Sequence, residues 1–168
     1  MPGDRRGDAF AAGEAGAQQL VEDTALEYLV LGDVTVLIDT TEGIQVITDD
    51  RVDRTARAER EEADRHPFGS AEKQAALLRM KHAELAARNQ PGGYWVAAAD
   101  PFAAQHAVTG DVPLDSVRRV AVLTDGAARL VALFGLLDWP DVLEVLEQNG
   151  PTELIRRVRA IEAATRPA

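Results

Sequence analysis

Residues 120–131, VAVLTDGAARLV, constrain the fold more than any other part of the chain. Their first four residues are apolar and predict a buried strand, and a helical pattern begins directly after Thr124-Asp125-Gly126. We therefore expect Asp125 at the carboxyl end of a core strand. A carboxylate beside an apolar strand is unfavourable unless it meets a metal ion, a cation or a helix N-terminus. Asp before Gly is common in turns and helix caps, so on this motif alone a capping role is the favoured explanation of Asp125.

The overall composition indicates a globular protein and excludes several kinds of site. The 168 residues are enough for one domain with a hydrophobic core, and 28 acidic against 18 basic residues give a net charge of −10. This charge makes nucleic acid and anionic membranes poor partners. The chain has no cysteine, which excludes disulfides, thiolate zinc sites and a thiol nucleophile. Its apolar runs are too short for a membrane span and its first residues are not a secretory signal, so we expect a cytoplasmic protein.

The chain divides into a short arm and one domain. Residues 1–24 are small and polar without a sustained period, which predicts a flexible arm with a short helix near residues 15–21. Residues 25–168 form the predicted domain, and it begins with a three-stranded meander over 26–48. The first of these strands is apolar on both faces. It must therefore be covered on both sides or lie against another chain.

The rest of the pattern predicts an α+β fold with mainly antiparallel strands packed by helix pairs. Further strands are expected over 94–99 and 117–124, in one sheet with the meander. Helices are expected over 50–64, 71–88, 103–108, 127–134, 138–148 and 152–164, with Asp138 as an N-cap. The inner face of the helix over 71–88 is expected to consist of Ala75, Leu78, His82 and Leu85. His82 then has a structural role, because no second metal-binding side chain stands four residues on.

Two carboxylates, Asp33 and Asp125, stand in glycine-containing turns next to predicted strands. Carboxylates on rigid strand ends suit Mg²⁺ or Mn²⁺, because these ions prefer a few oxygen ligands and keep several waters. Each turn is an unspecific signal by itself. The order of the two turns along the chain says more about the family of the protein than either turn does alone.

Three short motifs recur in the order of a known family. Residues 29–35 (LVLGDVT) look like a "GDS" hairpin, residues 46–53 (VITDDRVD) like an "LTxDH" segment, and residues 120–130 (VAVLTDGAARL) like an "LxSDG" strand and helix start. By these motifs residues 25–165 resemble the C-terminal half of the metal-dependent protein phosphatases of the PP2C type, in the divergent form found in high-GC bacteria.

The resemblance implies a partial PP2C-like fold and a metal-dependent activity on protein phosphoserine or phosphothreonine. In that family a metal-bound hydroxide attacks the phosphate monoester without a covalent enzyme intermediate. By the resemblance, Asp125 is a direct ligand of a binuclear Mg²⁺ or Mn²⁺ centre, and Asp33 helps to hold an additional, weaker ion.

The chain departs from the family pattern at three places. The family's early Asp-Gly metal motif and phosphate-binding arginine are expected before residue 25, where this sequence has only the polar arm. Its late Asp-Asn or Asp-Asp ligand is expected after the last helix, where this sequence stops at Ala168, so we expect the metal ligands at both ends to be missing. Val34 replaces the Ser of the "GDS" turn. Two hypotheses follow. One is an incomplete PP2C-like phosphatase domain, with weak metal binding and weak or no activity alone, and the other is a non-catalytic pseudophosphatase or protein-interaction module.

The same departures predict association with another chain. Segments that cover the sheet in the family lie outside the matched motifs, so an exposed strand edge is expected to pair with a second copy or another protein. The residues expected to be exposed there are Leu26, Leu29, Val30 and Leu31.

Overall fold

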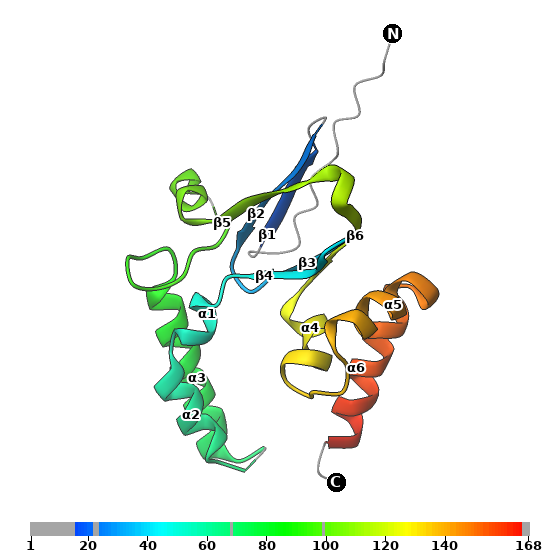
Figure 1. Cartoon of the computed structure of the whole chain (residues 1–168). Helices are drawn as coiled ribbons and strands as arrows, with labels where there is room; N and C mark the ends of the chain where they lie inside the picture. The colour runs from blue at the N-terminus through cyan, green and yellow to red at the C-terminus, as the bar shows by residue number, and fades with distance from the viewer. Residues whose placement is uncertain (1–15, 22–23, 68, 99, 166–168) are drawn as a thin grey trace.

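The computed structural model describes residues 16–21, 24–67, 69–98 and 100–165 (Figure 1). Its strands form two three-stranded antiparallel sheets. Sheet A has the order β1-β2-β5 and consists of β1 (Gly16–Val21), β2 (Ala25–Leu31) and β5 (Val108–Pro113). Sheet B has the order β4-β3-β6 and consists of β3 (Thr35–Thr40), β4 (Gly43–Thr48) and β6 (Val117–Leu123).

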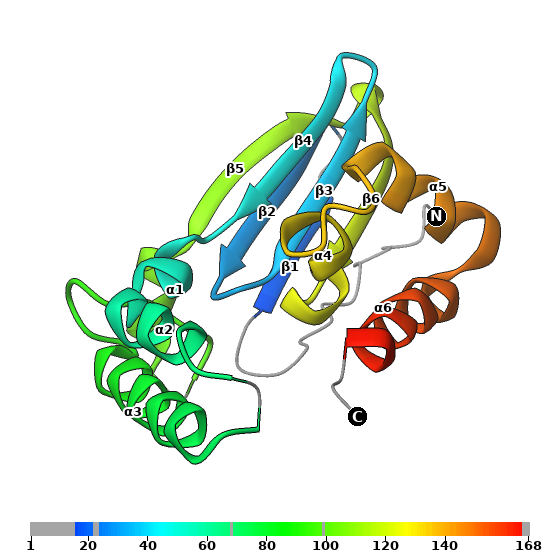
Figure 2. The same ribbon diagram turned by 90° about the horizontal axis from the view of Figure 1, so that it is seen from below.

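The two sheets pack face to face, as the stacked strands of Figure 2 show. Residues of both sheets meet in one core because alternate side chains of a strand point to the same face. Val30 of β2 and Ile38 of β3 are fully buried there. The other buried members of this core are Leu26, Val34, Val36, Ile47 and Val112.

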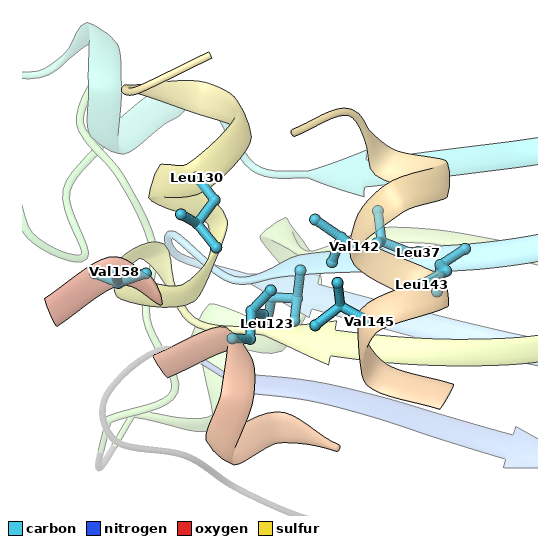
Figure 3. Packing of buried hydrophobic residues seen from close by; sticks show 8 residues of the cluster. Leu37, Leu123, Leu130, Val142, Leu143, Val145 and Val158 are labelled. Atoms are coloured by element: carbon cyan, nitrogen blue, oxygen red, sulfur yellow. The ribbon is translucent and has the colours of Figure 1, made fainter. Parts of the chain in front are cut away.

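Three helices cover the outer face of sheet B: α4 (Asp125–Ala132), α5 (Trp139–Asn149) and α6 (Pro151–Thr165). Leu37 of β3 and Leu123 of β6 pack against their apolar faces (Figure 3). The helical residues in this cluster are Leu130, Val142, Leu143, Val145, Leu154 and Val158. The predicted N-cap of α5 is confirmed, since Asp138 accepts a hydrogen bond of 2.9 Å from the backbone N–H of Asp141.

A second helical group consists of α1 (Arg51–Arg54), α2 (Arg57–Asp64) and α3 (Ala71–Ala87), and α2 and α3 lie side by side as a hairpin in Figures 1 and 2. The helix predicted over 50–64 is broken at Ala56, which has a left-handed φ of 53°. The predicted inner face of α3 is wrong. Ala76 and Glu84 are buried, whereas the predicted inner residues Ala75, Leu78, His82 and Leu85 are all exposed.

The predicted mixture of helices and antiparallel strands is confirmed, but the strands form two sheets instead of one. The strand predicted over 94–99 is wrong for residues 94–98, where Tyr94 makes only an isolated bridge to Arg88; residue 99 lies outside the described residues. Residues 109–113 belong to β5, although Gly110 and Pro113 are residue types typical of turns. The short helix predicted over 103–108 is a 3₁₀ helix, η1 (Pro101–His106), and η2 (Leu114–Ser116) is another, between β5 and β6.

Strand β2 is the centre of sheet A and has no free edge. Residues 16–21 of the predicted arm form β1 and pair along it, so the predicted helix near residues 15–21 is wrong; residues 1–15 and 22–23 lie outside the described residues. The predicted exposure of its apolar residues is also wrong: Leu26, Val30 and Leu31 are buried and Leu29 is half-buried. Leu31 packs against Trp95 and Ala103, so the chain between β4 and β5 covers this face. No helix in the described part of the chain is long and apolar enough to cross a membrane.

Candidate functional site

The three sequence motifs meet at one end of sheet B. Strand β3 is antiparallel to both of its neighbours, and its first residue, Thr35, lies opposite Thr48 at the end of β4 and Leu123 at the end of β6. Asp33 therefore lies just before the point where β4 and β6 end. Asp125 follows β6, and α1 follows β4, so residues far apart in the sequence are brought to the same place.

A cavity of about 480 Å³ lies at this end of the sheet, and we call it the acidic cavity. Asp33 and Asp125 line it, together with Asp53 of α1. The α2–α3 hairpin forms the facing wall. Its charged contributions are Arg60, Lys81 and Glu84.

Asp125 is in the first turn of α4. The N-cap of this helix is Thr124, which makes no side-chain capping bond, so Asp125 does not cap the helix. A carboxylate in the first turn is favoured by the partial positive charge of the helix N-terminus. This position keeps the Asp125 carboxylate at the cavity wall.

The electrostatics of the acidic cavity are dominated by its carboxylates. Burial raises the pKa of Asp33 above its ordinary value, and the negative charges of Asp125 and Asp53 raise this pKa further. A backbone hydrogen bond and the charge of Lys81 act in the opposite direction. Asp33 is thus harder to ionise than a free aspartate, and a bound cation would favour its charged form.

Two of the carboxylates are already balanced by cations. Glu84 is buried and accepts hydrogen bonds from Arg60 Nη2 at 3.2 Å and Lys81 Nζ at 2.9 Å. Arg60 Nη1 also lies 3.9 Å from Asp53 Oδ1. In contrast, none of the described cations forms an ion pair with Asp33 or Asp125. These two carboxylates are the ones predicted from the sequence as metal ligands.

The donor atoms of Asp33 and Asp125 fit Mg²⁺ or Mn²⁺ in kind, since both ions prefer carboxylate oxygens. Their number is small. Within residues 16–21, 24–67, 69–98 and 100–165, no three His, Asp or Glu side chains are close enough together to hold a metal ion. The cavity thus offers two carboxylates, Asp33 and Asp125, that are without a described ion pair.

Sequence reasoning missed the contribution of the helical hairpin to the cavity. Lys81 and Glu84 stand three residues apart on α3; the buried Glu84 lies on the face away from the predicted inner residues, and the exposed Lys81 flanks them. A lysine and a glutamate at this spacing indicate a surface ion pair on a helix and nothing more specific. Only the packing of α3 beside sheet B places them at the cavity.

Two residues of the "LTxDH"-like segment, Asp49 and Arg51, have a structural role. Asp49 is 4% exposed and accepts hydrogen bonds from Arg51 Nε and Nη2, each at 2.7 Å. Arg51 Nη2 also donates to the backbone oxygen of His106 at 2.6 Å, so the pair connects α1 to η1. A second cavity, of about 640 Å³, lies beside Arg51 and Arg54. Both arginines are paired with carboxylates, Asp49 and Asp50.

Comparisons with protein-family models, with curated proteins and with solved structures find no match to this chain. The features of this chain that point to a function are the three motifs and the geometry of the acidic cavity.

Proposed function

We propose that the chain carries part of a PP2C-type protein phosphatase domain and that the acidic cavity binds a divalent cation together with a phosphate monoester. The observation that carries this proposal is the meeting of the three motifs at one end of sheet B, with Asp33 and Asp125 on the wall of one cavity. The ligand class, a phosphoserine or phosphothreonine side chain of a protein, comes from the resemblance of the motifs.

Each charged group of the cavity has a role in this proposal. Asp125 and Asp33 hold Mg²⁺ or Mn²⁺ through carboxylate oxygens, and a cation bound there lowers the pKa of water and neutralises phosphate oxygens. Lys81 is 66% exposed in its side chain and offers a positive charge to the phosphate at the cavity mouth. Glu84 holds Lys81 and Arg60 in place through its two hydrogen bonds.

A second candidate function is a non-catalytic pseudophosphatase or protein-interaction module. The pairing of Glu84 and Asp53 with Arg60 and Lys81 favours it, because these two carboxylates are then less available to a cation. In this case the cavity would bind the cation or the phosphate without turnover.

Hydrolysis of para-nitrophenyl phosphate with Mn²⁺, together with calorimetry of Mn²⁺ binding, tests both candidates. We expect a dissociation constant no better than about 1 mM, as for oxygen sites of low charge. Asp125→Ala should abolish both binding and any hydrolysis, whereas Asp115→Ala, at an exposed position of η2 outside the cavity, should change neither.

The outcomes separate the two candidates. Turnover that depends on Mn²⁺ and on Asp125 supports the phosphatase. Mn²⁺ binding that depends on Asp125 without turnover supports the non-catalytic module. Micromolar binding would show that further ligands exist, and binding that survives both Asp125→Ala and Asp33→Ala would contradict the proposed site.

A further inference from the structure

Helix α3 is apolar on two faces, and α2 covers one of them. Ala76 is buried against α2, and Met80 is half-buried on the same side. The opposite face carries a second row of residues, all exposed, which we call the α3 seam. The seam consists of Ala71, Ala75, Leu78, His82 and Leu85.

The seam residues are spaced alternately four and three positions apart along a helix of 17 residues. This is the spacing of the contact positions in a two-stranded coiled coil. Leu78 is 58% exposed and Leu85 is 59% exposed. A single exposed leucine is ordinary on a protein surface, but a row in coiled-coil register along a whole helix indicates a contact with another helix.

We propose that the α3 seam pairs with the α3 seam of a second copy of this chain, with the two helices antiparallel. The residues that flank the seam argue for this occupant. Glu72 and Arg79 lie on one flank, and Gln74 and Lys81 lie on the other. In an antiparallel pair each flank faces the same flank of the other helix, so Glu72 lies beside Arg79 of the second copy and Arg79 beside its Glu72.

A parallel pair lacks this complementarity. Opposite flanks then face each other, which places Gln74 near Arg79 of the second copy and Lys81 near its Ala86. The antiparallel register that joins Glu72 to Arg79 also places Leu78 opposite Ala75, and the small alanine lets the helices approach closely.

The charge of the chain does not oppose this contact. The net charge is −10, but α3 itself carries three basic residues, Lys73, Arg79 and Lys81, against two acidic ones, Glu72 and Glu84. Arg79 already donates to Glu62 of α2 at 2.7 Å, yet its side chain is 53% exposed and a guanidinium has five N–H donors. Arg79 can therefore donate hydrogen bonds to Glu62 and to a second carboxylate at the same time.

Sedimentation velocity of the full chain, from about 10 µM to about 1 mM, tests the pairing, since a contact of this size is weak. The wild-type protein should form dimers as the concentration rises. Leu78→Lys should weaken association at least about tenfold, because a charge then lies at the centre of the contact. The matched control is Leu133→Lys, at a leucine that is 62% exposed and outside the seam, and it should associate as the wild type does.

Charge reversal tests the antiparallel arrangement. The first variant, Glu72→Arg, should weaken the dimer. The second combines Arg79→Glu with Glu62→Arg and should weaken it too. The added Glu62→Arg keeps the ion pair between α2 and α3, with the positive and negative charges exchanged. An equal mixture of these two variants should dimerise again, because each chain then offers the charge that the other needs. Circular dichroism melts confirm that each variant is folded.

Three results would overturn the proposal: a wild-type chain that stays monomeric over the whole range, a dimer insensitive to Leu78→Lys, or an equal loss in Leu78→Lys and Leu133→Lys. Association that survives Leu78→Lys would place the contact elsewhere, for instance at a strand edge. Dimers that fail to re-form in the mixture would exclude the antiparallel register.

Discussion

Asp33 and Asp125 lie on the wall of one cavity because Thr35 pairs with Leu123, and the charge of Asp125 contributes to the raised pKa of Asp33. The sequence supplies the two aspartates, the strand pairing brings them to one cavity, and there the charge of one affects the pKa of the other. Two turns that are unspecific by themselves become neighbours through the antiparallel register of β3 and β6. Two carboxylates on the wall of one cavity attract a proton or a cation.

The first prediction concerns this coupling. Asp125→Asn should lower the pKa of Asp33, because one of the negative charges that oppose its ionisation is removed. Burial is the larger cause and stays, so the pKa should remain above its ordinary value. Carboxyl ¹³C NMR titration measures this pKa, and Asp115→Asn is the control at an exposed carboxylate outside the cavity. An unchanged titration of Asp33 in Asp125→Asn would show that the two groups do not interact.

The second prediction concerns the pH dependence of stability. Asp33 has a folded pKa above its ordinary value of 3.8, so its contribution to stability is fully present below pH 3.8 and is lost as the pH rises through the folded pKa. Asp33→Asn removes the carboxylate that is costly to ionise. The variant should therefore melt at a higher temperature than the wild type at neutral pH, and this advantage should vanish toward acid pH. Calorimetric scans across the acid range measure the difference, and an advantage of equal size at every pH would contradict the stated cause.

The third prediction concerns a carboxylate in the middle of sheet B. Asp39 is 6% exposed on the central strand β3, and Arg119 Nε donates to its Oδ2 at 2.8 Å. Arg119 also forms an ion pair with Glu147 of α5, so it ties the sheet to its covering helix. Arg119→Met should lower the free energy of unfolding by about 1–3 kcal/mol, because it leaves a buried carboxylate without its main partner.

Arg118→Met is the matched control for Arg119→Met. Arg118 lies next to it in β6, is 59% exposed, and approaches Asp39 only to 3.8 Å. Its loss should cost less than about 0.5 kcal/mol, as for exposed ion pairs. Urea denaturation compares the two variants. Similar losses in both would mean that the charge near Asp39 matters and the hydrogen bond does not.

Local signals in the sequence predicted those elements that local chemistry determines. Helix α5 begins where Asp138 and the following Trp-Pro indicate a capped start, and the structure has the capping box there. The apolar run after Gly93 was predicted to be a strand, and its residues Trp95 and Val96 are buried. However, residues 94–98 do not form a strand. Trp95 is buried by packing against Leu31 and by stacking on His106 at a centroid distance of 3.7 Å, contacts that no local pattern encodes.

Long-range packing decided the features that the sequence could not predict. Helix α3 has apolar residues on two faces, so periodicity could not say which one α2 would cover. Strand β5 contains Gly110 and Pro113, which indicate a turn, yet it pairs with β2 and takes an edge position where proline is tolerated. The residues of the candidate site fall into the same two groups, those predictable from the sequence and those placed by long-range packing. Asp33 and Asp125 follow from motifs, whereas Lys81 and Glu84 reach the cavity only through the hairpin.

The fourth prediction concerns the turn after α3, in which Gly93 lies close to the backbone of Ala87. A Cβ built at Gly93 would lie 1.9 Å from the backbone oxygen of Ala87, which also accepts a hydrogen bond from the N–H of Tyr94 at 3.3 Å. Backbone atoms cannot rotate away as a side-chain end can, so Gly93→Ala must move the end of α3 or the start of the next segment. We expect it to lower the free energy of unfolding by about 2–3 kcal/mol, as for overpacked positions. Because Tyr94 lines the acidic cavity, the same change should also weaken Mn²⁺ binding there.

Gly126→Ala is the control for Gly93→Ala, since it makes the same chemical change at an open position. The nearest atom to its Cβ is Thr124 Oγ1 at 3.9 Å, and the residue lies in the first turn of α4, where alanine favours the helix. This variant should be more stable than the wild type by about 0.5–1 kcal/mol. Chemical denaturation of both variants measures the two effects, which are expected to have opposite signs. If Gly93→Ala were as stable as the wild type, the close approach of Gly93 to Ala87 would not exist in solution, and the hairpin would meet sheet B in a different way.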